Sequence, residues 1–213
     1  MEPGEKVMFF VPGKHKEQGL PYNPFKACVL PRPIAWLSTQ SAEGVCNLAP
    51  YSFFNAFADE PPIIGVGIAP DSREEGRKDT LRNIQETEEF VFNLVSWEQR
   101  TAMNESSKPA PAHVDEFEAA GLEKLSSTFI KPPRVKGAPV HFECKLFKTV
   151  DLPEDDAGKH YTLVLGEVIG MHIDEAYMTD GLVDATKMKP LARLGYQDYS
   201  VVEEVIQLVR PTA

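Results

Sequence analysis

The sequence is poor in cysteine. Its three cysteines, Cys28, Cys46 and Cys144, are odd in number and far apart. No two of them have the Cys-x-x-Cys spacing of zinc and redox sites, which argues against both a disulfide scaffold and a zinc centre. We therefore expect all three to be small buried hydrophobic residues.

Long apolar runs are also missing. None approaches the roughly eighteen residues that a membrane-spanning helix needs. The segment 1–14 contains Glu2, Glu5 and Lys6 before any apolar stretch and has no small-residue cleavage site, so it does not resemble a signal peptide. These features predict a cytoplasmic protein without a membrane partner.

Positive charge is scarce as well. The 22 Lys and Arg residues stand against 32 Asp and Glu, for a formal net charge of -10. Because such a field repels polyanions, nucleic acid is not an expected partner, and any anion site must be locally basic.

The chain also lacks a P-loop, a Gly-x-Gly-x-x-Gly turn opening a helix, a Gly-x-Ser-x-Gly elbow, metal-ligand spacing and an evident acid and base pair.

Proline and glycine, in contrast, are frequent. Eighteen prolines and fourteen glycines divide the 213 residues into short apolar segments rich in β-branched and aromatic residues. This pattern predicts one domain, residues 1–213, that is mainly β with short helices. The expected strands cover residues 34–39, 45–48, 63–68, 90–95, 140–150 and 161–173. Two short helices, over 97–107 and 114–120, form a helical insertion at about 97–121 that Gly121 ends. The segment 190–211 is not assigned.

The last two strands differ in pattern. Apolar residues alternate with His141, Glu143 and other polar residues over 140–150, which predicts a half-buried strand with these two side chains on the solvent face.

The strand 161–173 is apolar on both faces. It places Leu163 and Leu165 on one face and Val164, Val168 and Gly170 on the other. Such a strand is covered on both sides, and a second subunit would supply the outer cover.

A local reversal of charge follows the third strand. Arg73, Arg77, Lys78 and Arg82 surround the start of a short helix that Thr80 can cap. Backbone amides at a helix N-terminus, a hydroxyl and fixed cations together suit a phosphate group. The alternative is a solvated loop in which these cations pair with the neighbouring carboxylates.

The hairpin 31–54 mixes aromatic rings, hydroxyls and an amide in an otherwise apolar sheet. The residues concerned are Trp36, Ser38, Thr39, Asn47, Tyr51 and Ser52. Rings and apolar walls cover the faces of a flat aromatic cofactor, and polar groups meet its edge. The alternative is that these aromatics belong to the core.

Several linked segments resemble the flavin reductase-like family, in the order and spacing of its flavoredoxin branch. They are Pro-Arg-Pro-Ile-Ala-Trp-Leu-Ser-Thr at 31–39, Asn-Leu-Ala-Pro-Tyr-Ser-Phe-Phe at 47–54, Arg-Lys-Asp-Thr-Leu-Arg-Asn-Ile at 77–84 and Phe-Val-Phe-Asn-Leu at 90–94. Later segments, including Pro-Leu-Ala-Arg-Leu-Gly at 190–195, extend the match to about residues 20–200. Agreement over so many blocks is more specific than one short motif.

The resemblance implies an FMN-binding split β-barrel that works as a homodimer, with the flavin near the subunit interface. Lys78 and Thr80, with Arg77, would meet the phosphate, and Trp36 would flank the ring. The full set of cofactor residues that it implies is Trp36, Ser38, Thr39, Asn47, Leu48, Ala49, Ser52, Arg77, Lys78 and Thr80. No catalytic residue is assigned.

The expected function is an NAD(P)H-dependent flavin reductase, in which hydride passes from NADH or NADPH to FMN and electrons pass on to an acceptor. A cofactor that performs the chemistry explains why no acid and base pair is needed. Two alternatives stay open: a flavoredoxin-like electron carrier that serves a redox partner protein and has no nicotinamide site, and a non-catalytic flavin-binding protein.

Overall fold

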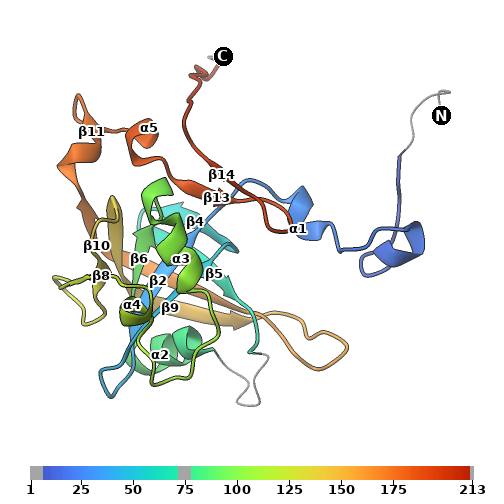
Figure 1. Ribbon diagram of the computed structural model, residues 1–213, viewed down its shortest axis with the longest axis horizontal. Coiled ribbons are helices and arrows are strands. Elements are labelled where there is room, and N and C mark those ends of the chain that lie inside the picture. Colours follow the sequence, from blue (N-terminus) through green and yellow to red (C-terminus); the bar gives the residue numbers. More distant parts are fainter. Residues whose placement is uncertain (1–6, 72–77, 212–213) are drawn as a thin grey trace.

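The computed structural model describes residues 7–71 and 78–211 (Figure 1). Its main feature is a seven-stranded antiparallel sheet with the strand order β3-β2-β6-β9-β10-β5-β4. The strands are β2 (Ala35–Gln40), β3 (Cys46–Tyr51), β4 (Phe54–Asp59), β5 (Pro62–Ile68), β6 (Glu89–Leu94), β9 (Val140–Asp151) and β10 (Thr162–Ile173). All six strands predicted from the sequence are confirmed, with boundaries that differ by a few residues.

Short elements surround this sheet. The helices are η1 (His15–Gln18), α1 (Phe25–Cys28), α2 (Asp79–Thr87), η2 (Trp97–Gln99), α3 (Arg100–Glu105), α4 (Glu116–Ala119), η3 (Glu175–Tyr177) and α5 (Ala185–Met188). The small strands are β1 (Arg32–Pro33), β7 (Lys124–Leu125), β8 (Arg134–Val135), β11 (Met178–Thr179), β12 (Leu182–Val183), β13 (Leu191–Arg193) and β14 (Tyr199–Val201). The expected fold class, mainly β with short helices, is confirmed. None of the helices in the described ranges is long and apolar enough to cross a membrane.

The main core is formed by apolar side chains of the sheet. Leu37, Val66, Phe90 and Val164 are buried there together with Cys144. Fully burying a large aliphatic or aromatic side chain contributes about 1.5–3 kcal/mol to stability. Helix α2 adds Leu81 and Ile84 to the same core, so this helix packs against the apolar side chains of the sheet.

A second core lies between β2 and β3 and the helical insertion. Trp36 and Leu48 from the two strands pack with Met103 of α3 and Phe117 of α4. Figure 1 shows α3 and α4 over the front of β2. The short helices η2 and α3 lie within the expected range 97–107, and α4 lies within 114–120. Gly121 has the left-handed φ of +67° that the sequence predicted. Packing of this kind fixes α3 beside β3.

The expectation that His141 and Glu143 face solvent is wrong. Their side chains are 5% and 0% exposed. The chain over residues 126–135 covers them, because Glu143 accepts hydrogen bonds from the backbone N–H groups of Thr128 and Phe129, both at 2.7 Å. His172 Nε2 lies 2.6 Å from the same carboxylate. A polar strand face can thus be buried when backbone donors satisfy it.

Strand β10 was predicted to be covered on both faces, and in this structure only the face that carries Val164 and Val168 is fully buried. Val164 and Val168 are buried, whereas Leu163 and Leu165 are half-buried. Gly170 is on the opposite face from the one predicted, because a β-bulge between Val168 and Gly170 shifts the register by one residue. A Cβ at Gly170 would lie 3.1 Å from the ring of Phe129, so the glycine allows residues 126–135 to pack closely.

The cysteines are free in this structure. Cys46 and Cys144 are buried, as expected. Cys28 is exposed, so the expectation is wrong for this residue. It lies at the end of the four-residue helix α1, which buries none of its residues.

Candidate functional site

A groove runs along β3 from the start of α2 to the small sheet of β13 and β14. It consists of three adjoining cavities of about 140, 360 and 650 Å³, which we call the helix cavity, the central cavity and the outer cavity. Tyr51 and Ser107 line both the helix and central cavities. Met103, Asn104 and Arg193 are shared by the central and outer cavities, as is Tyr199. The three cavities are therefore neighbours along one groove.

The helix cavity lies at the N-terminus of α2. Helix α2 begins at Asp79 with Lys78 as its N-cap, and the Lys78 side chain makes no capping hydrogen bond. The expectation that Thr80 caps this helix is wrong, because Thr80 is the second residue within it. The first turn of the helix thus lines the cavity and has no side-chain cap, which is the arrangement that favours an anion.

The Thr80 hydroxyl is held by β3. Its oxygen accepts hydrogen bonds from Asn47 Nδ2 at 2.8 Å and from the Tyr51 hydroxyl at 2.9 Å. Asn47 Nδ2 also donates to Thr39 Oγ1 at 3.2 Å. Asn83 Nδ2 donates to this Thr39 oxygen as well, at 3.1 Å. A hydroxyl has two lone pairs and one proton. Since both lone pairs of Thr80 are used, its proton is left to donate to a ligand.

Charge in the helix cavity is mixed. Lys78 Nζ lies 5.8 Å from the centroid of the Tyr51 ring. Asp79 pairs with Arg82 Nη2 at 2.7 Å. The carboxyl group of Glu116 accepts a hydrogen bond from the Leu48 N–H at 3.0 Å, and burial raises its pKa above the usual range. Two other cations of the predicted basic segment, Arg73 and Arg77, lie outside the described residues.

The Tyr51 phenol separates the helix cavity from the central one. Burial raises its pKa, so the hydroxyl stays protonated at physiological pH and remains a donor to Thr80. The Tyr51 hydroxyl therefore holds the Thr80 oxygen in place, and Tyr51 also forms part of the wall of the central cavity.

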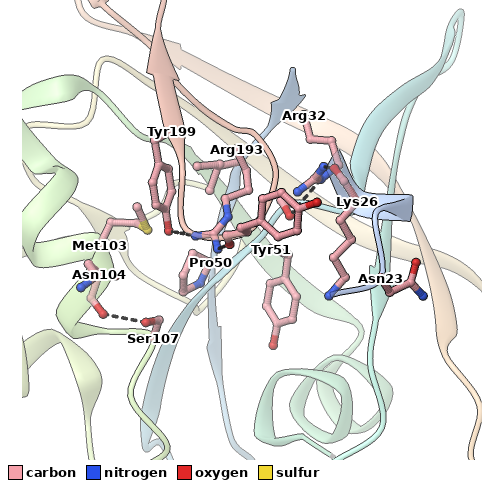
Figure 2. A pocket seen from close by; sticks show the side chains of 13 residues that line it. Asn23, Lys26, Arg32, Pro50, Tyr51, Met103, Asn104, Ser107, Arg193 and Tyr199 are labelled. Atoms are coloured by element: carbon pink, nitrogen blue, oxygen red, sulfur yellow. Dashed lines mark hydrogen bonds between the residues drawn. The ribbon is translucent and has the colours of Figure 1, made fainter. Parts of the chain in front are cut away.

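The central cavity is wider and combines apolar and polar walls (Figure 2). Its lining residues are Asn23, Lys26, Arg32, Ile34, Pro50, Tyr51, Ser52, Met103, Asn104, Ser107, Arg193, Tyr196 and Tyr199. Figure 2 shows Arg193 and Tyr199 approaching the same space as Pro50 and Tyr51 of β3. This combination of flat apolar surfaces with hydroxyls, amides and cations suits a planar ligand with a polar edge.

The predicted cofactor residues are divided between the groove and the core. Asn47, Ala49, Lys78 and Thr80 line the helix cavity, and Ser52 lines the central cavity. Thr39 lies behind the cavity wall and holds Asn47.

Three other predicted residues do not line these cavities. Ser38 is buried and donates to the Pro133 carbonyl at 2.5 Å, and Leu48 is in the second core. The Trp36 side chain is 0% exposed, and its Nε1 donates to Ser106 Oγ at 2.9 Å. Trp36 therefore offers no exposed face to a ligand, because α3 and the chain that follows it cover the ring.

Sequence reasoning missed several groove residues. Ser107, Glu116 and Tyr199 line it without having been singled out. Arg193 stood within a matching family segment but received no role. Their positions depend on how the helical insertion and the C-terminal strands fold back onto β3, and no local pattern signals that.

Comparison with solved structures shows the same architecture. The nitrilotriacetate monooxygenase component B from Bacillus cereus superposes with a TM-score of 0.87 at 31% identity, over 96% of this chain and 100% of that chain. The 2-nitrobenzoate 2-nitroreductase from Pseudomonas fluorescens has a TM-score of 0.81 at 31% identity, over 97% of both chains. The flavoredoxin of Desulfovibrio vulgaris (Miyazaki F), at 21% identity, shares the fold with a TM-score of 0.72 over 84% of this chain and 91% of that chain.

Sequence comparisons agree. An uncharacterized protein of Aquifex aeolicus is 39% identical over 173 residues, which cover 80% of this chain and 84% of the relative. The model of the flavin reductase like domain matches residues 27–192. The resemblance noted in the sequence is therefore confirmed, and the chain belongs to the flavin reductase-like family.

Proposed function

We propose that the chain binds FMN along the helix and central cavities and acts as an NAD(P)H-dependent flavin reductase. In this reaction hydride passes from NADH or NADPH to the flavin, and the electrons pass on to an acceptor. The observation that carries the proposal is the groove itself. An uncapped helix N-terminus with Lys78 and Thr80 adjoins a wider cavity suited to a planar ring, in a chain of this family.

At the phosphate end, the chain supplies three kinds of donor. These are the N–H groups of the first turn of α2, the proton of the Thr80 hydroxyl and the ammonium group of Lys78. Charge-assisted hydrogen bonds of this type are the strong ones. We assign Arg77 to the same end on the family resemblance. The ionised carboxylate of Glu116 opposes the phosphate, and its raised pKa lessens that opposition.

Between the two ends, the chain offers small polar side chains. Ser107 lines both cavities, and Asn47 and Ala49 of β3 also line the helix cavity. We assign this stretch to the ribityl chain, whose hydroxyls need such partners. Ser52 then meets the ring edge in the central cavity, where it already accepts a hydrogen bond from Arg32 Nε at 3.4 Å.

The flavin, when bound, supplies the hydride-accepting chemistry. The chain holds and orients it, and it provides positive charge where reduction leaves negative charge on the ring. Arg32 and Arg193 both line the central cavity, and cations held in place by the protein stabilise developing negative charge without reorganisation.

We also propose that the protein is a homodimer. The face of the sheet around Gly65 is apolar and open, since Phe57 is 59% exposed and Leu165 is half-buried. A Cβ at Gly65 would lie 2.4 Å from the Phe57 ring and 3.1 Å from Leu165 Cδ2, which places these side chains side by side. A second copy would cover this patch.

The test begins with the visible absorption spectrum of the purified protein, before and after FMN is added and the excess is removed. A flavin spectrum that stays with the protein is expected. Anaerobic addition of NADH or NADPH should then bleach it. Failure to retain FMN contradicts the proposal. Retention without bleaching by either nucleotide favours the electron-carrier function over the reductase.

A further inference from the structure

Positive charge gathers in the central and outer cavities of a chain whose net charge is -10. Lys26, Arg32 and Arg193 line the central cavity, and Arg100 joins Arg193 at the outer one. Among the described residues, no Asp or Glu lines either cavity. The helix cavity is different, because three carboxyl residues line it. The excess of cations is therefore a local property of this half of the groove.

Neutral groups hold the arginines. Arg193 donates to the Tyr199 hydroxyl and to the Tyr196 carbonyl. Arg100 Nη1 donates to the Trp97 carbonyl at 2.8 Å. Within residues 7–71 and 78–211, neither guanidinium forms a salt bridge with a carboxylate. Neutral acceptors fix a guanidinium but leave its charge uncompensated, and that charge remains available to an anion.

The third arginine of the groove has a different part. Arg32 is buried and donates to the carbonyl groups of Lys26, Val29 and Leu194. These bonds engage most of its donors, so Arg32 contributes charge to the central cavity more than direct hydrogen bonds. Burial lowers its pKa, and the positive charge of Arg193, which lines the same cavity, lowers it further by repulsion. An anion between them would relieve that repulsion.

Two arginine and aromatic pairs form the outer cavity. The Arg100 guanidinium lies 3.9 Å from the centroid of the Trp97 ring, and that of Arg193 lies 4.4 Å from the centroid of the Tyr199 ring. All four residues line this cavity. Stacking on a ring restrains the plane of a guanidinium, and the planar fork then recognises phosphate or carboxylate oxygens. Two restrained forks at one cavity suit a ligand with two linked anionic groups.

The FMN phosphate does not account for this cavity, because the proposed phosphate end is at the other end of the groove. The outer cavity, of about 650 Å³, adjoins the cavity assigned to the flavin ring, so a molecule bound there can reach the ring. Resting on the function proposed above, we propose that Arg100 and Arg193 bind the diphosphate of a dinucleotide electron donor.

The direct test uses ADP-ribose, which carries the diphosphate but no nicotinamide. Its affinity for the FMN-saturated protein is measured by titration calorimetry in wild type, in Arg100→Gln and in the matched control Lys148→Gln. Lys148 is an exposed residue of β9 that lines none of the three cavities. Losing a charge-assisted contact to a diphosphate should weaken binding by roughly ten- to a hundredfold in Arg100→Gln. Lys148→Gln should bind as wild type does.

A kinetic test separates the diphosphate from the nicotinamide. N-benzyl-1,4-dihydronicotinamide is a reduced donor without phosphate. The ratio of the KM for NADPH to the KM for this donor should rise about tenfold or more in Arg100→Gln, and it should stay constant in Lys148→Gln. Arg100 stacks on the Trp97 ring and donates to the Trp97 carbonyl, and among the described residues it forms no salt bridge, so the substitution removes no ion pair there.

The outcomes distinguish this inference from the function on which it rests. Equal ADP-ribose affinities in Arg100→Gln and Lys148→Gln would overturn the diphosphate site. The diphosphate site would also be overturned if the wild-type protein holds FMN and oxidises N-benzyl-1,4-dihydronicotinamide but does not bind ADP-ribose. In that case the proposed flavin reduction would remain supported without the site. A wild-type protein that retains no FMN overturns the proposed function itself.

Discussion

The Tyr51 hydroxyl donates a hydrogen bond to the Thr80 hydroxyl at 2.9 Å and so joins the end of β3 to the first turn of α2. Asn47 completes the arrangement with a second donor to the same oxygen. Both donors are buried or nearly so. The proposed phosphate end of the groove is therefore already formed by the protein alone, and a ligand need not reorganise it.

Lys78→Ala should weaken FMN binding by roughly ten- to a hundredfold, because a charge-assisted bond to the phosphate contributes about 1.5–3 kcal/mol. Riboflavin has the same ring and ribityl chain without the phosphate, so its affinity should barely change. Fluorescence titration with both ligands measures the ratio of the two affinities, with Lys148→Ala as the control. An unchanged ratio in Lys78→Ala would mean that the phosphate lies elsewhere.

Thr80→Val removes the hydroxyl proton that we assign to the phosphate. FMN affinity should fall by roughly three- to tenfold, in line with one hydrogen bond of about 1 kcal/mol. The free energy of unfolding should also fall, by about 1–3 kcal/mol, because the buried donors of Asn47 and Tyr51 lose their acceptor. Thr80→Ser retains the hydroxyl and should preserve most of both quantities. The hypothesis is rejected if Ser and Val variants bind FMN equally well.

Glu116→Gln should tighten FMN binding several-fold at pH 8, since it removes a negative charge from the helix cavity while its amide oxygen can still accept from the Leu48 N–H.

Burial raises the pKa of Glu116 in the folded protein. A raised carboxyl pKa means that the stability contributed by the protonated group is lost as pH rises through the folded value. The difference in unfolding free energy between Glu116→Gln and the wild type should therefore shift in favour of the variant as pH rises from acidic to neutral.

The control for this prediction is Glu118→Gln, an exposed position on the same helix, α4. It makes the same change in net charge without lining the helix cavity. An equal effect of the two substitutions on FMN affinity would show that only the overall charge matters.

His141 should make the fold sensitive to acid. Burial lowers its pKa to about 4, from an ordinary value of 6.5. A depressed pKa means that the neutral form is favoured in the folded state, so this stability is complete above pH 6.5 and is lost as pH falls toward 4. Urea unfolding at a series of pH values measures how the unfolding free energy changes with pH. Between pH 6.5 and 4 this dependence should be weaker in His141→Gln than in the wild type. The substitution His113→Gln, at an exposed position, should leave it unchanged.

The homodimer should give a sedimentation mass of two 23.7 kDa chains at micromolar concentration. Phe57→Glu places a charge on the open apolar patch beside Leu165 and should shift the mass toward the monomer. Leu182→Glu, at an exposed position of β12, is the control and should leave the mass unchanged. A wild-type protein that sediments as a monomer would contradict the proposed assembly.

Local pattern was sufficient for the strands and for the family. Alternation and turn residues placed each main strand within a few residues, because side-chain period and turn chemistry act over short distances. The linked segments at 31–54 and 77–84 identified the family, and Asn47, Ala49, Ser52, Lys78 and Thr80 from these segments line the groove.

Tertiary structure alone decided how several of these side chains are used. Trp36 reads as a candidate ring contact in sequence, yet α3 and the residues after it cover its ring completely. His141 and Glu143 have a polar pattern typical of a solvent face, but residues 126–135 bury them and satisfy them with backbone groups.

The groove itself also depends on the tertiary structure. Arg193 and Tyr199 reach β3 only because β13 pairs with β1, which lies about 160 residues earlier in the chain. Burial and cavity lining depend on which distant segment folds over a residue, and a local sequence pattern contains no information about that cover. The sequence by itself thus determined the strands and the family of this protein, and the packing of distant segments decided which side chains face the groove.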